Sequence, residues 1–185
     1  MGTRHMIGVI ANKKFCVAQY GQWDGYPSGQ GISVLNFLRS LTPVGLSVFK
    51  EKCLAVNAGK NEEIEALCTG HDWTEKYPEF SCDTSVGIFN ILMERDNGVI
   101  LCVNSDFGKD SLWCAWAYIV NFDTGKLECY KGFNHRKLAK KERFYTEKPT
   151  YVAHDGKEYW GCRLLKEYSL KRLPSDETFI KALKE

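Results

Sequence analysis

The chain has 185 residues, of which 44% are hydrophobic and 26% are charged, values typical of one soluble globular domain with its own core. Its 25 basic and 23 acidic residues give a formal net charge of +2, which argues against a nucleic-acid polymer as partner because proteins that bind such polyanions carry a strong positive excess. We therefore expect residues 1–185 to form a single domain.

The composition also bears on location. The apolar N-terminal segment, residues 6–11, is too short for a signal peptide and runs directly into Asn12-Lys13-Lys14. No stretch reaches the roughly 18 apolar residues of a membrane span, so we expect a cytoplasmic protein without membrane contact. The eight cysteines form no Cys-x-x-Cys pair, and we expect free thiols, no metal site and no cofactor.

The chain begins with a pattern that predicts a β-hairpin. Residues 3–11 are rich in Ile and Val, residues 15–20 form a second apolar run, and Asn12-Lys13-Lys14 is a short polar turn between them.

A run of helices is predicted after the hairpin. Apolar residues recur with helical spacing in residues 32–41. Thr42 and Pro43 suit the N-cap and first position of a second helix, Asn61 suits the cap of a third, and Asp83 or Thr84 that of a fourth. The expected helices span residues 32–41, 43–56, 61–68 and 84–94, the last stopped by Asp96-Asn97-Gly98, and a loop spans 69–81.

The second half predicts a sheet. The turns at residues 123–126 and 155–156 are typical of hairpins, and Ser175 suits the cap of a final helix. The expected strands span residues 99–103, 112–122, 127–133, 150–154 and 157–164. Together these elements predict an α+β fold, a mostly antiparallel sheet built from hairpins with several helices on one face.

One segment, residues 19–31, has no aliphatic side chain. Its glycines let the backbone approach another group, and its rings and neutral hydrogen-bonding groups suit a recognition surface. Hairpin pairing is expected to bring Arg4 close to it. The candidate ligand-binding residues are Arg4, Gln19, Tyr20, Gln22, Trp23, Asp24, Tyr26, Ser28 and Gln30.

Several of these residues have two interpretations. Arg4, expected near Tyr20 and Asp24, either pairs with Asp24 to hold the loop or offers a bidentate fork to a phosphate or carboxylate. Trp23 and Tyr26 are either plugs packed on the sheet or stacking platforms for a planar group. The helix start after the loop is expected to add N–H groups that favour an anion.

The sequence does not point to catalysis. Asp24 without a second carboxylate is weak evidence for a general base, and removal of the initiator methionine would not expose Thr3 as an N-terminal nucleophile. The basic cluster 135–143 is either a solvated face or a phosphate-facing patch. Trp113 and Trp116 are expected on opposite sides of a strand, one buried and one exposed.

Three motifs are distinctive: Met1-Gly2-Thr3-Arg4, the loop at 18–31 with its Gln-Tyr-Gly-Gln-Trp-Asp-Gly-Tyr-Pro run, and Leu-Trp-Cys-Ala-Trp-Ala-Tyr at 112–118 followed by Glu-Cys-Tyr-Lys-Gly-Phe at 128–133. With them, most of the chain resembles a group of short hypothetical proteins from bacteriophages, bacteria and filamentous fungi. The group has no established activity, so the resemblance implies no catalytic residue. Members often have Glu before Trp-Ala-Tyr, where this chain has Ala115. A phage origin would imply a role against host defence.

These observations favour a non-enzymatic protein that binds a small polar, nucleotide-like ligand. In a phage it would sequester a host signalling nucleotide in the host cytoplasm. Two alternatives stay open: a hydrolase or transferase that acts on such a ligand, and a protein-interaction module that inhibits a host protein. Assembly into a homo-oligomer is also left open.

Overall fold

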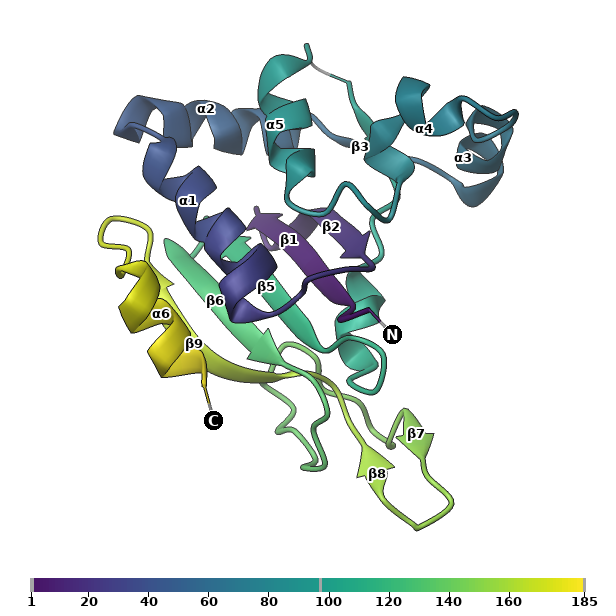
Figure 1. Ribbon diagram of the computed structural model, residues 1–185, viewed down its shortest axis with the longest axis vertical. Coiled ribbons are helices and arrows are strands. Elements are labelled where there is room, and N and C mark those ends of the chain that lie inside the picture. The colour runs from purple at the N-terminus through teal and green to yellow at the C-terminus, as the bar shows by residue number, and fades with distance from the viewer. Residues whose placement is uncertain (1, 97, 185) are drawn as a thin grey trace.

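The structure, a computed structural model, describes residues 2–96 and 98–184. Within these ranges it has an α+β fold, as the sequence predicts (Figure 1). The main sheet contains β1 (His5–Ala11), β2 (Lys14–Gly21), β5 (Trp116–Asn121), β6 (Lys126–Lys131) and β9 (Arg163–Ser169). The helices are α1 (Ile32–Ser40), α2 (Pro43–Leu54), α3 (Asn61–Leu67), α4 (Trp73–Lys76), α5 (Gly87–Glu94) and α6 (Asp176–Leu183).

The strands of the main sheet lie in the order β2-β1-β5-β6-β9. Neighbouring strands are antiparallel except β1 and β5, which run parallel with His5 opposite Trp116 and Ile10 opposite Asn121. A parallel pair needs a crossover connection, and the helical segment between β2 and β5 supplies it. The sheet is thus mostly antiparallel, with one parallel pair that the hairpin patterns did not predict.

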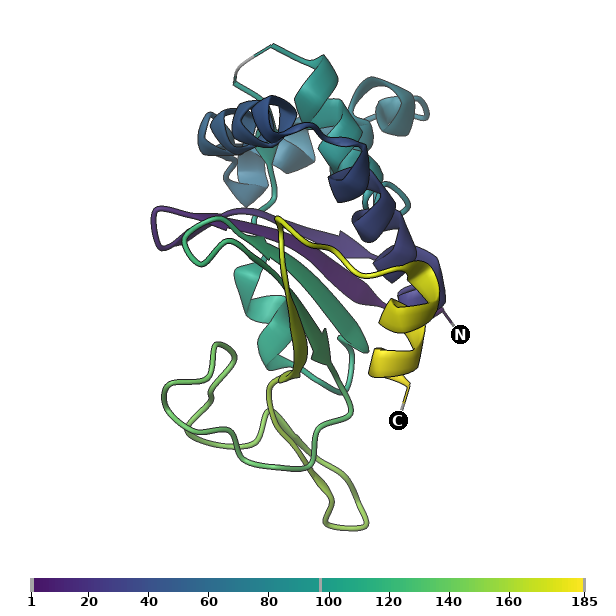
Figure 2. The ribbon, with the colours of Figure 1, turned by 90° about the vertical axis from the view of Figure 1, so that its left-hand side faces the viewer.

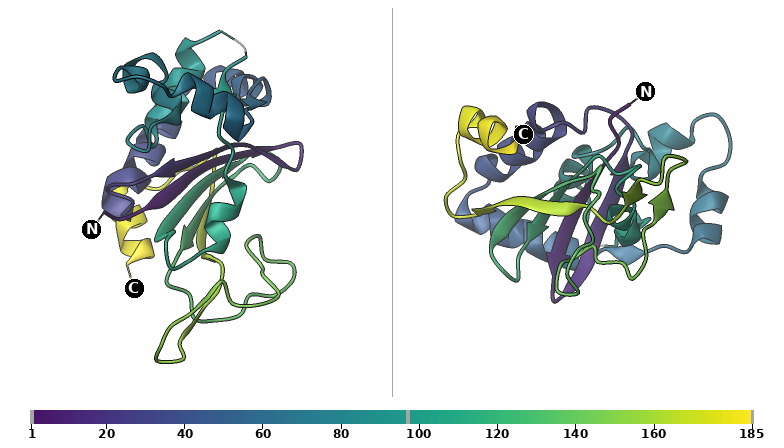
Figure 3. Two further views of the ribbon diagram at one scale, coloured as in Figure 1. Left: turned by 90° about the vertical axis from the view of Figure 1, so that its right-hand side faces the viewer. Right: turned by 90° about the horizontal axis from the view of Figure 1, so that it is seen from below.

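The sheet separates two apolar layers. Ile7 and Val9 of β1 point toward α1, α2, α5 and α6, whereas Met6 and Ile10 point to the opposite face. That second face is covered by the short 3₁₀ helix η3 (Ser105–Lys109) and by the long connection of residues 132–162. Figures 2 and 3 show the helices on one side of the sheet and this connection on the other. The alternation of strand side chains therefore builds a core on each face.

The turn between β1 and β2 is held by hydrogen bonds to the turn between β5 and β6. Asn12 and Lys13 have φ angles of +54° and +63°, the left-handed conformation that a two-residue hairpin turn requires. Their backbone N–H groups donate to the carboxylate of Asp123 at 2.9 and 2.7 Å. Asp123 lies in the turn between β5 and β6, so the two hairpins meet at this end of the sheet.

Two predicted helix caps are confirmed. Thr42 accepts a hydrogen bond from Gly45 N–H at 3.0 Å, and Ser175 accepts one from Thr178 N–H at 3.3 Å. The other helix starts differ from expectation. Helix α5 begins at Gly87 because residues 82–86 form a series of turns, so neither Asp83 nor Thr84 caps it. Helix α3 follows Lys60, so Asn61 is its first residue and not its cap. Asn97 of the expected stop signal lies outside the described residues.

The predicted loop 69–81 contains two short helical segments, α4 and the 3₁₀ helix η2 (Pro78–Phe80). Part of the expected strand 99–103 is present as β4 (Ile100–Leu101), which pairs in parallel with β3 (Asn57–Ala58). The expected strand 112–122 begins only at Trp116, because Leu112 and Trp113 lie in a turn whose N–H groups donate to Asp110.

The last predicted hairpin is present in shortened form. It consists of β7 (Tyr151–Val152) and β8 (Glu158–Tyr159). The chain then leaves the hairpin and joins the main sheet as β9, which pairs with β6. The strand expected at 157–164 covers only the first two residues of β9.

In the described part of the chain, no single helix has the length and apolar composition needed to cross a membrane. The segments Pro27–Ser40 and Pro43–Leu54 meet that criterion only as a pair, and they are bent by 117° relative to each other.

Candidate functional site

The loop of residues 22–31 folds back onto the start of β1. Gly25 N–H donates to the Thr3 carbonyl at 2.9 Å, and the buried Tyr118 hydroxyl donates to the Gly25 carbonyl at 3.0 Å. The backbone turns sharply at Asp24, which has a φ of +56°, and then forms a π-helical turn, η1 (Pro27–Gly31), before α1. These contacts hold the loop against the N-terminal residues (Figure 1).

The start of the helix does not offer the N–H groups that were expected to favour an anion. Gly29 and Gly31 N–H donate to the Tyr26 carbonyl, and Gln30 N–H donates to the Asp24 carbonyl at 2.9 Å. Gly31 is buried, and a Cβ there would approach Tyr118 and Phe179 to about 3 Å. The helix start is therefore occupied by contacts within the protein.

The glutamine side chains of the loop also have partners within the protein. Gln19 is buried, and its Nε2 donates to the Ser81 carbonyl at 3.0 Å. Gln30 Oε1 accepts from Val86 N–H at 3.3 Å. Both contacts attach the loop to the segment before α5.

The side chains of Tyr20 and Gln22 are hydrogen-bonded to each other: the Tyr20 hydroxyl donates to Gln22 Oε1. The Tyr20 ring packs edge-on against Phe107, with ring centroids 5.1 Å apart. The side chains of Asp24 and Ser28 are exposed. Of the nine predicted ligand-binding residues, Arg4 and Tyr26 line one cavity, and Gln19 and Tyr20 line another.

That cavity has a volume of about 560 Å³ and lies beside Arg4. Its walls come from the N-terminal residues, the loop, the turn before β5 and the end of β6. The side chains that matter for its chemistry are Arg4, Tyr26, Trp113, Trp116, Lys131 and Phe133. We call it the aromatic pocket.

Arg4 lies on the face of an aromatic ring. Its Cζ is 4.5 Å from the centroid of the Trp113 ring, a cation–π geometry, and its carbonyl accepts from Ala115 N–H at 3.0 Å. The guanidinium therefore contacts Trp113, a residue outside the segment 19–31. Among the described residues no ion pair joins Arg4 to Asp24.

Three aromatic side chains are exposed at the pocket. The exposed fractions are 48% for Trp113, 55% for Tyr26 and 54% for Phe133, whereas Trp116 is buried. The prediction that one of Trp113 and Trp116 is buried and the other exposed is confirmed. Trp23 is also exposed, but it packs against Gly2 and does not line the pocket.

Phe133 is held in an unfavourable backbone conformation. Its φ is +49°, which is rare for a bulky residue. Its N–H donates to the Ser111 carbonyl at 2.7 Å, and the next residue, Asn134, donates to the Ser111 hydroxyl at 3.1 Å. Strained backbone of this kind persists where the surroundings enforce it and is concentrated at functional sites.

A row of residues crosses the sheet beside the pocket. His5, Trp116, Lys131 and Arg163 lie directly opposite one another on β1, β5, β6 and β9. Lys131 Nζ lies 5.7 Å from the Trp116 ring centroid. Burial lowers the pKa of Lys131, and the charge of Arg163 adds to this effect. None of the described residues that line the pocket is acidic.

The His5 ring lies beneath the loop. It is fully buried against Gly21, Gly25 and Ser85, and neither ring nitrogen has a hydrogen-bond partner among the described residues. Burial lowers the pKa of His5 to about 4, against the opposing effects of the Thr3 backbone and of the Asp24 charge. The imidazole is therefore neutral at physiological pH.

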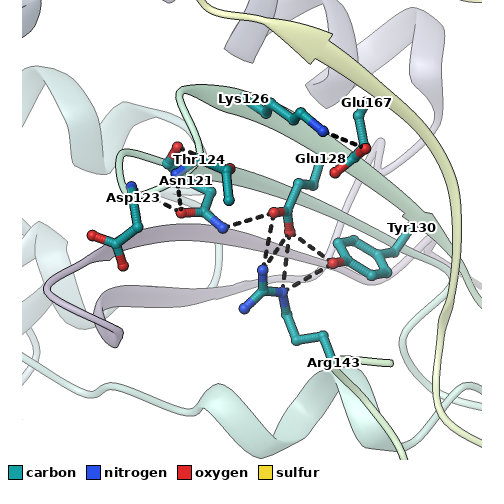
Figure 4. Close-up of polar contacts among 8 residues, drawn as sticks. All are labelled: Asn121, Asp123, Thr124, Lys126, Glu128, Tyr130, Arg143 and Glu167. Atoms are coloured by element: carbon teal, nitrogen blue, oxygen red, sulfur yellow. Dashed lines mark hydrogen bonds and ion pairs between the residues drawn. The ribbon is translucent and has the colours of Figure 1, made fainter. Parts of the chain in front are cut away.

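A polar network lies on the opposite face of the sheet from the main helices (Figure 4). The buried carboxylate of Glu128 accepts from Asn121 Nδ2 and the Tyr130 hydroxyl, each at 2.7 Å, and from the Arg143 guanidinium. Burial raises the pKa of Tyr130. Arg143 belongs to the basic cluster 135–143, so this member of the cluster serves an internal ion pair.

Four of the six pocket side chains named above were not among the predicted site residues: Trp113, Trp116, Lys131 and Phe133. Trp113 was recognised only as one of two tryptophans that could be exposed. Lys131 ends β6 and Phe133 follows it, more than 100 residues from Arg4, and the signal in the sequence that includes them is the motif at 128–133.

No protein family, no curated protein and no solved structure matches the chain. In the part of the chain that the structure describes, no group of three or more His, Cys, Asp or Glu side chains is arranged to hold a metal ion.

Proposed function

We propose that the protein binds a small polar, nucleotide-like ligand in the aromatic pocket. The observation that carries this proposal is the Arg4 guanidinium stacked on the exposed Trp113 ring, 4.5 Å from its centroid, at a cavity of about 560 Å³. This volume lies within the range of small-molecule sites.

The chemistry of the pocket suits the two parts of a nucleotide. Exposed rings of Tyr26, Trp113 and Phe133 offer faces on which a planar base can stack. Arg4 supplies positive charge for a phosphate group. The strained Phe133 supports a binding role, because its conformation exposes an aromatic ring at a cost to stability.

We further propose that the ligand is held without chemical change. The side chains described around the pocket provide rings, cations and hydroxyl groups, which suit binding better than proton transfer. Taken with the motifs that resemble phage proteins, this favours sequestration of a host signalling nucleotide in the host cytoplasm, a role against host defence.

The test is to incubate the purified protein with cyclic and ADP-ribose-type nucleotides, release bound material by heat and analyse it by chromatography. We expect intact ligand from the unmodified protein and much less from Trp113→Ala. Recovery of a changed product would instead support the alternative of a hydrolase or transferase.

A second candidate function is inhibition of a host protein through direct contact. It is favoured by the exposure of Trp23 and Tyr26, since exposed aromatic residues dominate many protein interfaces. A pull-down from host lysate with Trp23→Ala as the comparison tests it. Loss of a protein partner with nucleotide binding intact would support this function.

A further inference from the structure

We infer that the protein has a second binding site, which binds a small aliphatic primary amine in its charged ammonium form. The site is a cavity of about 360 Å³, which we call the Glu79 pocket. Its walls come from the end of α3, the turn at η2, the residues that follow α5 and the start of β4. Helices α3, α4 and α5 lie together in the upper part of Figure 1. None of the described residues lines both this pocket and the aromatic pocket, so the inference does not depend on nucleotide binding.

The first argument is a buried carboxylate oxygen without a partner. Glu79 is only 4% exposed, and the Arg95 guanidinium contacts its Oε1. Its Oε2 is buried and has no hydrogen-bond partner among the described residues. Lys52 does not supply one, because its Nζ donates to the Arg95 carbonyl at 2.6 Å. Since a buried carboxylate needs hydrogen-bond donors, Glu79 favours a ligand that brings N–H groups and a positive charge.

The second argument is the charge of the pocket. Asp96 also lines it, is exposed, and takes part in no ion pair within the described part of the chain. The pocket therefore has two carboxylates, Glu79 and Asp96, but only one cationic side chain, Arg95. This excess of negative charge favours a cationic ligand over a neutral or anionic one.

The third argument is the aromatic wall. The rings of Tyr77 and Phe80 both line the pocket, with centroids 6.1 Å apart and planes inclined by 32°. Aromatic faces attract ammonium groups through the quadrupole of the ring. Leu67 and Val99 add apolar surface against which the alkyl chain of an amine can pack.

Other cations suit the pocket less well. A hard metal ion such as Ca²⁺ needs at least about six oxygen ligands, and no group of three or more His, Cys, Asp or Glu among the described residues is arranged to hold a metal. A quaternary ammonium ion has no N–H group for Glu79 Oε2. A primary ammonium group has three donors and a compact charge, so it suits both the carboxylates and the rings.

Glu79 also lines a neighbouring cavity of about 280 Å³. The other described residues around that cavity are Gln, Tyr, Phe, Cys and Asn, and none of them is a second carboxylate. Asp96 belongs to the Glu79 pocket alone. A variant at Asp96 therefore distinguishes binding in the two cavities.

The experiment is a titration followed by the backbone amide NMR signals of the protein, at pH 7 and fixed ionic strength. The probes are n-butylamine, putrescine, tetramethylammonium and n-butanol. Both amines carry their positive charge at this pH. We expect each amine to shift the signals of residues in the Glu79 pocket. Each should bind at least about tenfold more tightly than n-butanol and at least about threefold more tightly than tetramethylammonium.

Variants assign this preference to the two carboxylates. Glu79→Gln should weaken n-butylamine binding by at least about tenfold, and Asp96→Asn by about two- to fivefold. Circular dichroism checks that Glu79→Gln folds without its ion pair to Arg95, and Asp96→Asn provides the test at an exposed position. Glu94→Gln is the matched control, because Glu94 is exposed and lies two positions before Asp96 but outside the pocket. It should bind all four probes like the unmodified protein.

Three results would overturn the inference. Equal affinity for n-butylamine and n-butanol would show that the cavity recognises only an alkyl chain. An n-butylamine affinity that Asp96→Asn leaves unchanged, or that Glu94→Gln lowers equally, would show that the carboxylate of Asp96 is not used. Absence of amine-induced shifts at the residues of the Glu79 pocket would show that no amine binds there. Each of these results leaves the nucleotide proposal as it stands.

Discussion

Glu128 and Arg143 form a bidentate ion pair that attaches the long 132–162 connection to the sheet. Arg143 Nη2 lies 2.9 Å from Oε1 and 2.7 Å from Oε2 of Glu128, and Arg143 Nε lies 3.1 Å from Oε2. Only 4% of the Glu128 side chain is exposed, compared with 26% for Arg143. A buried carboxylate depends on such partners, because its desolvation is otherwise uncompensated.

Arg143→Ala should therefore lower the free energy of unfolding by about 3 kcal/mol, since it leaves the Glu128 carboxylate buried without its cation. Chemical denaturation measures this change. The matched control is Arg136→Ala, whose side chain is 66% exposed and pairs with Glu142 at 3.2 Å. Its effect should be about 0–1 kcal/mol. Equal effects of the two substitutions would contradict this account of the Glu128 network.

Trp113→Ala should weaken nucleotide binding by about ten- to a hundredfold, because it removes both a stacking face and the ring beneath Arg4. Stability should change little, since 48% of the Trp113 side chain is exposed. Trp23→Ala is the comparison, because Trp23 is 52% exposed and does not line the pocket. Titration calorimetry on both variants checks the prediction, which fails if Trp23→Ala has the larger effect.

The buried His5 should make the protein sensitive to acid. Its pKa is about 4 in the folded protein and about 6.5 when unfolded, so the unfolded state binds more protons between these values. Its contribution to stability is complete above about pH 6.5 and is lost as the pH falls toward 4, a total of about 3 kcal/mol.

Unfolding free energies measured from pH 4 to pH 7 test this. His5→Asn should flatten the dependence on pH in this window, whereas His154→Asn, at an exposed position, should retain it. A pH profile of His5→Asn with the same slope as the unmodified protein would show that other groups cause the acid sensitivity.

Phe133→Asn should stabilise the protein and weaken binding at the same time. Asn adopts positive φ angles more readily than Phe. Relief of the backbone strain at position 133, where φ is +49°, should therefore raise the free energy of unfolding by up to about 1 kcal/mol. Loss of the exposed ring should reduce nucleotide affinity. Thermal unfolding and calorimetry on one preparation measure both changes, and a loss of stability would refute the idea of backbone strain at this residue.

Local chemistry explains which parts of the fold are predictable from the sequence. The turns after Ala11 and Asn121 and the caps at Thr42 and Ser175 depend on residues within a few positions, and the structure has them. The parallel pairing of β1 with β5 depends on packing across the whole chain, so no short pattern marks it. The start of β9 lies only a few residues after the turn of the preceding hairpin. Its first residues were therefore assigned to that hairpin, and most of β9 was not predicted.

The candidate site, like the fold, was predicted only where it depends on residues close together in the sequence. Composition identified residues 19–31 as unusual, and Arg4 and Tyr26 do line a pocket. Composition does not tell whether a polar side chain is available, and the amides of Gln19 and Gln30 proved to be bonded within the protein. Trp113, Lys131 and Phe133 reach the pocket only through the pairing of distant strands.

The pairing of His5 with Trp116 has a consequence for how the protein is made. The two residues are 111 positions apart (116 − 5), so β1 leaves the ribosome long before its second neighbour in the sheet exists. At typical rates of translation the delay is about 5 to 20 seconds. During that time the apolar β1–β2 hairpin is a two-stranded ribbon with an open edge, which is marginally stable by itself and exposed to pairing with other chains.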